Sequence, residues 1–167
     1  RDWYGRYPQF SPTPGRIGYT GAIRRYKGVE SLVAAFTEVS DPGLSLRVAG
    51  KLSSGELGGE ITRLAAADPR VSYEFGFVEE PDFVREITQS ELVVLPYRHM
   101  HNSGIALACL SLGRPVLVPD NEVNQKLSDE VGPGWVHLFD AQVTATDLTS
   151  TLERLHREPP TAAPDLS

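Results

Sequence analysis

The stretch that decides the fold of this chain is Glu91–Asp120, ELVVLPYRHMHNSGIALACLSLGRPVLVPD. It contains two continuously apolar runs, LVVLP at Leu92–Pro96 and PVLVP at Pro115–Pro119, separated by a polar loop and an apolar run at Ile105–Gly113. Continuous apolar runs are typical of central strands in a parallel sheet, because helices cover both faces of such a sheet. The stretch therefore predicts a strand, a loop, a helix and a second strand at the middle of an α/β sheet.

The same alternation of strand-like and helix-like runs extends along the rest of the chain. The runs LSLRV (44–48) and VSYEFGF (71–77) alternate apolar and polar residues, which favours positions nearer a sheet edge. We predict a Rossmann-like, three-layer α/β fold with helices on both faces and parallel strands in the order 3-2-1-4-5-6. The expected strands are Arg16–Ile23, Leu44–Lys51, Arg70–Val78, Glu91–Tyr97, Pro115–Asp120 and Trp135–Phe139.

One domain, residues 16–157, accounts for nearly all of the chain. Residues 1–15 (RDWYGRYPQFSPTPG) are rich in aromatic residues, Pro and Gly, which predicts a linker or N-terminal arm. Residues 158–167 (EPPTAAPDLS) are predicted to form a disordered tail. The first residue is Arg1 and not Met, so we expect the chain to be part of a longer protein.

The composition excludes several classes of protein. A net charge of −6 argues against broad nucleic-acid binding, which needs a basic face to neutralise phosphates. No apolar run reaches the roughly 20 residues that a membrane-spanning helix needs. The single cysteine, Cys109, rules out an internal disulfide and a cysteine-based zinc site, and its apolar neighbours indicate a core residue. A cytoplasmic location is expected.

Positive charge gathers in the loop after the first predicted strand. The segment TGAIRRYKGVE (20–30) places Arg24, Arg25 and Lys27 within four positions of an otherwise acidic chain. In the predicted strand order this loop opens on the crevice between strands 1 and 4, where the chain reverses direction across the sheet. Ligands of such sheets bind in that crevice, at the carboxyl ends of the strands.

The loop after strand 4 opens on the same crevice. It brings Asn102 and Ser103, both good N-cap residues, and then Gly104 at the start of the predicted helix. A helix N-terminus offers free backbone N–H groups and the positive end of a dipole. Point charges from one loop and backbone amides from the other predict an anion site that suits a diphosphate.

These segments carry a family resemblance. GAIRRYKGVESLVAAF (21–36), LRVAGK (46–51), YEFGFVEEPDFVREI (73–87) and the stretch at 91–120 resemble, in order and spacing, the donor-binding C-terminal half of a GT-B glycosyltransferase of group 1 (GT4 type). The resemblance covers roughly residues 16–140. It implies a retaining transferase that moves a sugar from a nucleotide-diphosphate donor to an acceptor hydroxyl, in polysaccharide, glycolipid or natural-product glycosylation. It implies neither a cofactor nor a bound metal.

The resemblance also implies roles for particular residues. Arg24 and Lys27 would stabilise the donor diphosphate, whereas Arg25 is expected to be a solvated surface charge. The loop after strand 3 would receive the nucleotide base, and the helix after strand 4 would cap the phosphates. The implied donor-binding set is Gly21, Arg24, Lys27, Phe77, Val78, Asn102, Ser103, Gly104 and Ile105.

The chain departs from the family pattern at two positions. The family commonly carries two glutamates, which contact the sugar and the ribose, where this chain has Met100 and Ala108. Either other groups, such as His99, His101 or Asn102, take over these contacts, or the domain has lost activity. The resemblance further implies a missing N-terminal half that binds the acceptor, so this half alone should not transfer sugar. It leaves room for peripheral membrane contact through the full enzyme.

Two other interpretations are consistent with the sequence. One is a different GT-B enzyme, such as a nucleotide-sugar epimerase, and the other is a non-catalytic binding or partner module with a degenerate donor site. A redox Rossmann protein is disfavoured, because the first loop lacks G-x-G-x-x-G and carries cations instead. Ser103 lacks the G-x-S-x-G elbow of a nucleophilic serine.

Overall fold

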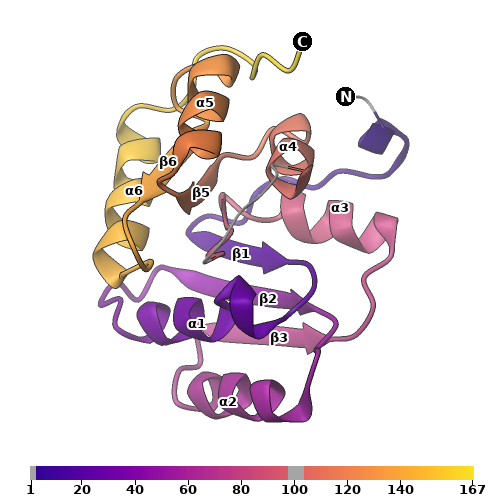
Figure 1. Ribbon diagram of the computed structural model, residues 1–167, viewed down its shortest axis with the longest axis vertical. Helices are drawn as coiled ribbons and strands as arrows, with labels where there is room; N and C mark the ends of the chain where they lie inside the picture. The colour runs from indigo at the N-terminus through magenta and orange to yellow at the C-terminus, as the bar shows by residue number, and fades with distance from the viewer. Residues whose placement is uncertain (1–2, 98–103) are drawn as a thin grey trace.

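The computed structural model of the protein describes residues 3–97 and 104–167. Helices and strands alternate along the described chain (Figure 1). They are η1 (Trp3–Arg6), β1 (Arg16–Thr20), η2 (Arg25–Lys27), α1 (Val29–Thr37), β2 (Ser45–Gly50), α2 (Gly55–Ala66), β3 (Val71–Phe75), α3 (Glu80–Thr88), β4 (Leu92–Val94), α4 (Gly104–Ser111), β5 (Val116–Pro119), α5 (Glu122–Val131), β6 (Val136–Phe139) and α6 (Ala145–Arg157).

The described strands form one parallel sheet in the order β3-β2-β1-β4-β5-β6, which confirms the predicted fold. Ile17 on β1 pairs with Leu46 on β2 and with Leu92 on β4, so β1 lies at the centre. Except for β6, which ends at Phe139 as predicted, the strands end earlier than predicted at their carboxyl ends. At β4, the ladder ends just before Pro96, which has no N–H to donate.

Helices cover both faces of the sheet (Figure 1). The helix α1 packs against α2 and α6, whereas α3 packs against β1. Since parallel crossovers are right-handed, reversal of the chain direction between β3 and β4 places α3 on the face opposite α1 and α2. The central strands are therefore buried on both sides, as their continuous apolar sequences predicted: β4 and β5 are buried throughout.

Both ends of the chain contact the domain. In the N-terminal arm, Trp3 Nε1 and Tyr7 Oη donate hydrogen bonds of 3.2 and 2.6 Å to the carboxylate of Glu80, at the start of α3. The tail at 158–167 contains no helix or strand. Its Ala162 carbonyl oxygen accepts a 2.9 Å hydrogen bond from Trp135 Nε1.

Candidate functional site

The candidate site lies at the carboxyl ends of β1 and β4, which are neighbours in the sheet. The chain leaves β1 toward β2 and leaves β4 toward β5, so this is the point where its direction across the sheet reverses. The two loops that follow these strands touch at Gly28. That residue has a φ of 70°, and a Cβ placed on it would lie 2.3 Å from the carbonyl oxygen of Pro96. Only glycine suits this contact.

The first part of the loop after β1, before the cations, runs alongside the end of β2. Gly21, one of the predicted donor-binding residues, donates a backbone hydrogen bond of 3.0 Å to the carbonyl oxygen of Ala49 on β2. Ile23 donates another, of 2.9 Å, to Lys51. These bonds anchor the backbone immediately before Arg24, where the chain is extended. The cations therefore project from a loop with a defined course.

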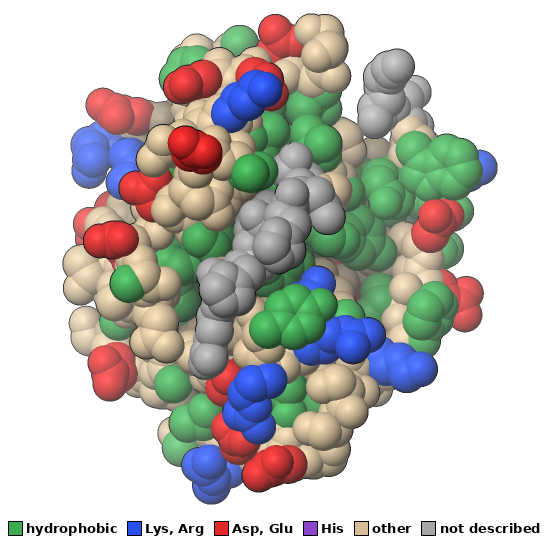
Figure 2. Space-filling view, in the orientation of Figure 1, with side chains coloured by type: hydrophobic (Ala, Val, Ile, Leu, Met, Phe, Trp, Pro, Cys, Tyr) green, Lys and Arg blue, Asp and Glu red, His purple; other side chains and the backbone are tan. Residues whose placement is uncertain are grey.

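The structure separates the three cations of this loop. Figure 2 shows Lys and Arg side chains gathered below the grey segment, over the region where Figure 1 draws α1, α2 and the ends of β2 and β3. Arg25 forms ion pairs with Glu60 at 2.8 Å and with Glu30 at 3.7 Å. Among residues 3–97 and 104–167, no acidic side chain pairs with Arg24 or Lys27. Two of the three charges thus stay available to an anion.

Lys27 has an aromatic environment that the sequence did not indicate. Its ammonium lies 4.6 Å from the ring centroid of Tyr97 and 5.8 Å from that of Tyr26. Partial burial, and secondly the positive charge of Arg24, lower the pKa of Lys27 below its ordinary value. An anion placed between Arg24 and Lys27 would offset both effects, because it favours the charged form of each. The sequence signal for Tyr97 is an aromatic residue directly after the apolar run Leu92–Pro96.

The loop after β3 holds the residues predicted to receive a base. Phe77 is 79% exposed, and Val78 is partly buried beside it. With Ala49 and Gly76 they line a small cavity of about 40 Å³ at the carboxyl ends of β2 and β3. An exposed aromatic ring offers a flat face on which a base can stack. Phe77 and Val78 therefore lie together at the carboxyl edge of the sheet.

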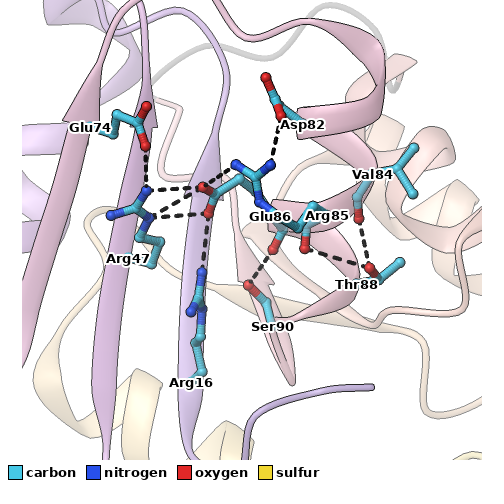
Figure 3. A network of polar contacts seen from close by, with 9 residues as sticks. All are labelled: Arg16, Arg47, Glu74, Asp82, Val84, Arg85, Glu86, Thr88 and Ser90. Carbon is cyan, nitrogen blue, oxygen red and sulfur yellow. Dashed lines mark hydrogen bonds and ion pairs between the residues drawn. The ribbon is translucent and has the colours of Figure 1, made fainter. Parts of the chain in front are cut away.

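The helix α3, which follows this loop, is fixed to the sheet by a buried carboxylate (Figure 3). Glu86 accepts hydrogen bonds from Arg16 on β1 at 3.1 Å and from Arg47 on β2 at 3.0 Å. Only 4% of the Glu86 side chain is exposed, so its charge is compensated in place of water by the guanidinium groups of Arg16 and Arg47 and, at 3.6 Å, by that of Arg85. Arg47 also reaches Glu74 at 2.9 Å. The network ties the C-terminal half of α3 to β1 and β2.

The helix α4 begins at Gly104, as the sequence predicted to within one residue. Gly104 is exposed, and Ile105 packs partly buried against the core. Ala108 presents a methyl group where the family commonly has a glutamate, so it offers no side-chain hydrogen bond to a ribose. The remaining predicted loop residues lie outside the described ones; these are Arg98, His99, Met100, His101, Asn102 and Ser103.

Cys109 is a core residue, as its apolar neighbours indicated. It is fully buried on α4, and burial raises the pKa of its thiol to about 12. A thiol that stays protonated is neither a nucleophile nor a metal ligand. In the part of the chain that the structure describes, no group of three or more His, Cys, Asp or Glu side chains could hold a metal ion.

A second cavity lies away from this site. It has a volume of about 490 Å³ and is found at the amino ends of β4 and β5, between the N-terminal arm and α6. Its lining includes Pro12, Glu91, Arg114, Leu155, His156 and Pro160.

None of the described helices is long and apolar enough to cross a bilayer.

Comparison with known proteins identifies a family. The family model "Glycosyl transferases group 1" matches residues 14–157. Two curated relatives from Xanthomonas campestris pv. campestris, each a GDP-mannose:glycolipid 4-beta-D-mannosyltransferase, are 45% and 44% identical over 167 residues. The matches cover 100% of this chain and 48% of each relative. The chain thus spans about half the length of the curated relatives it matches.

Solved structures share the fold. The C-terminal domain of a group 1 family glycosyl transferase from Francisella tularensis superposes with a TM-score of 0.65 at 16% identity, covering 89% of this chain and 78% of that one. A mutant of S. aureus TarM, in complex with fondaparinux, alpha-GlcNAc-glycerol and UDP, gives a TM-score of 0.70 at 15% identity, covering 92% and 31%. Anabaena Alr3699/HepE, in complex with UDP and glucose, gives a TM-score of 0.66 at 19% identity. The match covers 87% of this chain and 41% of that one.

Proposed function

Because this chain belongs to the group 1 glycosyltransferase family, we propose that it is the donor-binding half of a mannosyltransferase that uses GDP-mannose. The observation that carries the proposal is the pair of cations at the switch point, Arg24 and Lys27, which no described carboxylate neutralises. The choice of GDP-mannose, and of a glycolipid as the acceptor, rests on the relatives at 45% and 44% identity. The acceptor-binding half is proposed to lie elsewhere in the whole protein.

In this proposal the two cations act on the leaving group. Breaking the bond between the sugar and the diphosphate leaves additional negative charge on the GDP oxygens. We propose that Arg24 and Lys27 stabilise that charge, together with backbone N–H groups at the start of α4. Protein groups would thus take the place of a metal ion or other cofactor. Loss of one such cation should lower the rate by about 10²–10³-fold, by analogy with the loss of an oxyanion-hole donor.

The base and the ribose are proposed to bind at neighbouring loops. Guanine would stack near Phe77 and Val78, at the carboxyl end of β3, where a ring face is exposed. The ribose would have to be recognised without a carboxylate at position 108, since Ala108 lacks one. The chemistry therefore depends more on the diphosphate contacts than the family pattern implies.

The stereochemical outcome is a finer part of the proposal. The family resemblance implies retention, whereas the name of the relatives specifies a β linkage. GDP-mannose carries its sugar in the α configuration, so a β-linked product formed from it in one displacement corresponds to inversion. We propose inversion for this protein, at the cytoplasmic face of a membrane that holds the glycolipid. Proton–carbon coupling at the anomeric centre of the product distinguishes the two outcomes.

Nucleotide titration tests the donor site. Calorimetry on the protein in its natural length, with GDP, UDP, ADP and TDP, should show binding of GDP in preference to the others. The double variant Arg24→Ala and Lys27→Ala should abolish that binding. Arg63→Ala, which removes an exposed cation from α2, should leave it unchanged. Binding of a different nucleotide would overturn the choice of donor.

A non-catalytic module remains the second candidate, because Ala108 lacks the carboxylate that the family uses. That reading predicts no binding by any of the four nucleotides and no release of GDP from GDP-mannose when a glycolipid acceptor is added. Binding of GDP without turnover, in the complete protein, would indicate a donor site that has lost its chemistry. Turnover would exclude the module.

A further inference from the structure

The ring of Tyr97 lies directly beneath the ammonium group of Lys27. Tyr97 follows β4 and is 8% exposed, whereas Lys27 comes from the loop after β1. The distance of 4.6 Å from Nζ to the ring centroid lies within the range of about 6 Å for a cation–π contact. Of the two rings near Lys27, Tyr97 is the closer and the buried one, since Tyr26 is 5.8 Å away and 51% exposed.

A second aromatic ring, that of Tyr19, packs against Tyr97 and restricts its position. Tyr19, which is fully buried on β1, meets it edge-on, with ring centroids 6.4 Å apart and planes at 84°. The hydroxyl of Tyr19 donates a hydrogen bond to the carbonyl oxygen of Ala22, in the cation loop itself. Burial raises the pKa of Tyr97 to about 12, so the ring is a neutral phenol at physiological pH. Lys27 therefore rests on an uncharged aromatic face.

The backbone brings the two loops together at the same place. Gly28, the residue after Lys27, lies so close to Pro96, the residue before Tyr97, that a Cβ would be 2.3 Å from the Pro96 carbonyl oxygen. The contact between Lys27 and Tyr97 is thus flanked by a backbone contact between their neighbours. These contacts restrict the loop, and they therefore favour one position for Lys27.

We propose that Tyr97 is a positioning residue that holds the Lys27 ammonium in place for the diphosphate of the donor. The inference deepens the proposed function and rests on it. Lysine has a long flexible stem, and restricting it before the ligand arrives lowers the entropic cost of binding. A neutral ring restricts the ammonium without cancelling its charge. Arg25 differs from Lys27 in this respect, because the carboxylate of Glu60 both restricts the Arg25 guanidinium and neutralises its charge.

The contact itself can be measured in the protein without ligand. An aromatic ring shifts the resonances of protons above its face upfield, so the Lys27 Hε protons should be shifted upfield in the wild-type protein of natural length. The shift should persist in Tyr97→Phe, which keeps the ring, and disappear in Tyr97→Leu, which removes it. Lys27 protons at ordinary positions in the wild-type protein would overturn the proposal.

Nucleotide affinity then tests the functional role. Tyr97→Leu should weaken GDP binding about threefold to thirtyfold, the range of a cation–π contact, whereas Tyr97→Phe should retain wild-type affinity. Guanosine, which lacks the diphosphate, should bind all three proteins alike, and this readout detects any general loss of structure. In a Lys27→Ala background, Tyr97→Leu should have no further effect on GDP, because its partner is gone.

Several results would contradict the positioning role. Equal losses from Tyr97→Leu with and without Lys27 would show that the ring acts on the ligand or on folding. Tighter GDP binding in Tyr97→Leu would show that the ring competes with the diphosphate for the ammonium. If the wild-type protein binds no GDP, the proposed function fails and the role of Tyr97 fails with it. An upfield shift of Lys27 in that case would show that the contact is structural only.

Discussion

Arg25 and Glu60 form an ion pair with two hydrogen bonds, of 3.0 and 2.8 Å, between the cation loop and α2. The pair removes one of three neighbouring positive charges from the candidate site. The hydrogen bonds that Arg25 donates to Glu60 raise the pKa of Arg25 above its ordinary value, so this guanidinium stays charged and paired. The neighbouring Arg24 and Lys27 have no such partner among the described residues.

Replacement of Arg25 should therefore have little effect on the donor. We expect Arg25→Ala to change GDP affinity by less than about threefold, since an exposed pair contributes only about 0–1 kcal/mol. Lys27→Ala should weaken GDP binding about tenfold to a hundredfold, as expected for a charge-assisted contact. Calorimetric titration of the two variants side by side gives the comparison. Equal losses would show that Arg25 leaves Glu60 to contact the ligand.

The buried carboxylate of Glu86 should be important for stability. Glu86→Ala leaves Arg16 and Arg47 near the sheet without their shared partner, so the free energy of unfolding should fall by about 3–5 kcal/mol. Glu74→Ala is the matched control, because Glu74 also pairs with Arg47 but its side chain is 70% exposed. That change should cost at most about 1 kcal/mol. Urea denaturation measures both, and similar costs would contradict the dominant role of Glu86 (Figure 3).

The contact between Gly28 and Pro96 predicts a glycine requirement. Gly28→Ala should lower the free energy of unfolding by more than about 1 kcal/mol, because it adds strain at a φ of 70° to a Cβ that meets the Pro96 carbonyl. Gly59→Ala on α2 is the control, since no atom beyond its chain neighbours and its own helix backbone lies within 4 Å of its Cβ position. An exposed helical glycine should gain up to about 1 kcal/mol from alanine. A neutral Gly28→Ala variant would disprove the close approach of the two loops.

The stability of the fold should depend on the protonation of His137. This residue is buried on β6, and its Nε2 lies 3.0 Å from the Gly134 carbonyl oxygen. Burial first, and then the charge of Arg154, lower the pKa of His137 below its ordinary value of 6.5, whereas the Gly134 hydrogen bond opposes this shift. The unfolded chain therefore binds the proton more readily, and stability should fall as the pH drops below about 6.5.

The measurement for His137 is the free energy of unfolding as a function of pH. His137→Gln has no group that titrates in this range, so its curve should be flatter than that of the wild-type protein between about pH 7 and the lowered pKa. The difference between the two curves should stay constant above about pH 7.5, where the histidine is neutral in both states. Parallel curves throughout would indicate that His137 is protonated equally in the folded and unfolded chain.

The fold, and the loop in which the cations gather, could be predicted because their signals are local. Leu92–Pro96 and Pro115–Pro119 are continuously apolar, and hydrophobic burial on both faces requires that pattern wherever the strand lies in the fold. The segment at 20–30 likewise carries its cations within a few positions. The loop at 98–103, which holds the predicted Asn102 and Ser103, lies outside the described residues, so that part of the site remains a prediction.

By itself, then, the sequence determined the α/β class, the parallel order and the loop in which positive charge would gather. The tertiary structure alone decided which of those charges are available. Arg25 forms an ion pair with Glu60 on α2, and Lys27 forms a cation–π contact with Tyr97, which follows β4. Glu86 forms ion pairs with arginines on two strands. Periodicity reports the face on which a residue lies. The partner of a charged side chain depends on which distant element the folded backbone places within reach, and no local pattern encodes that distance.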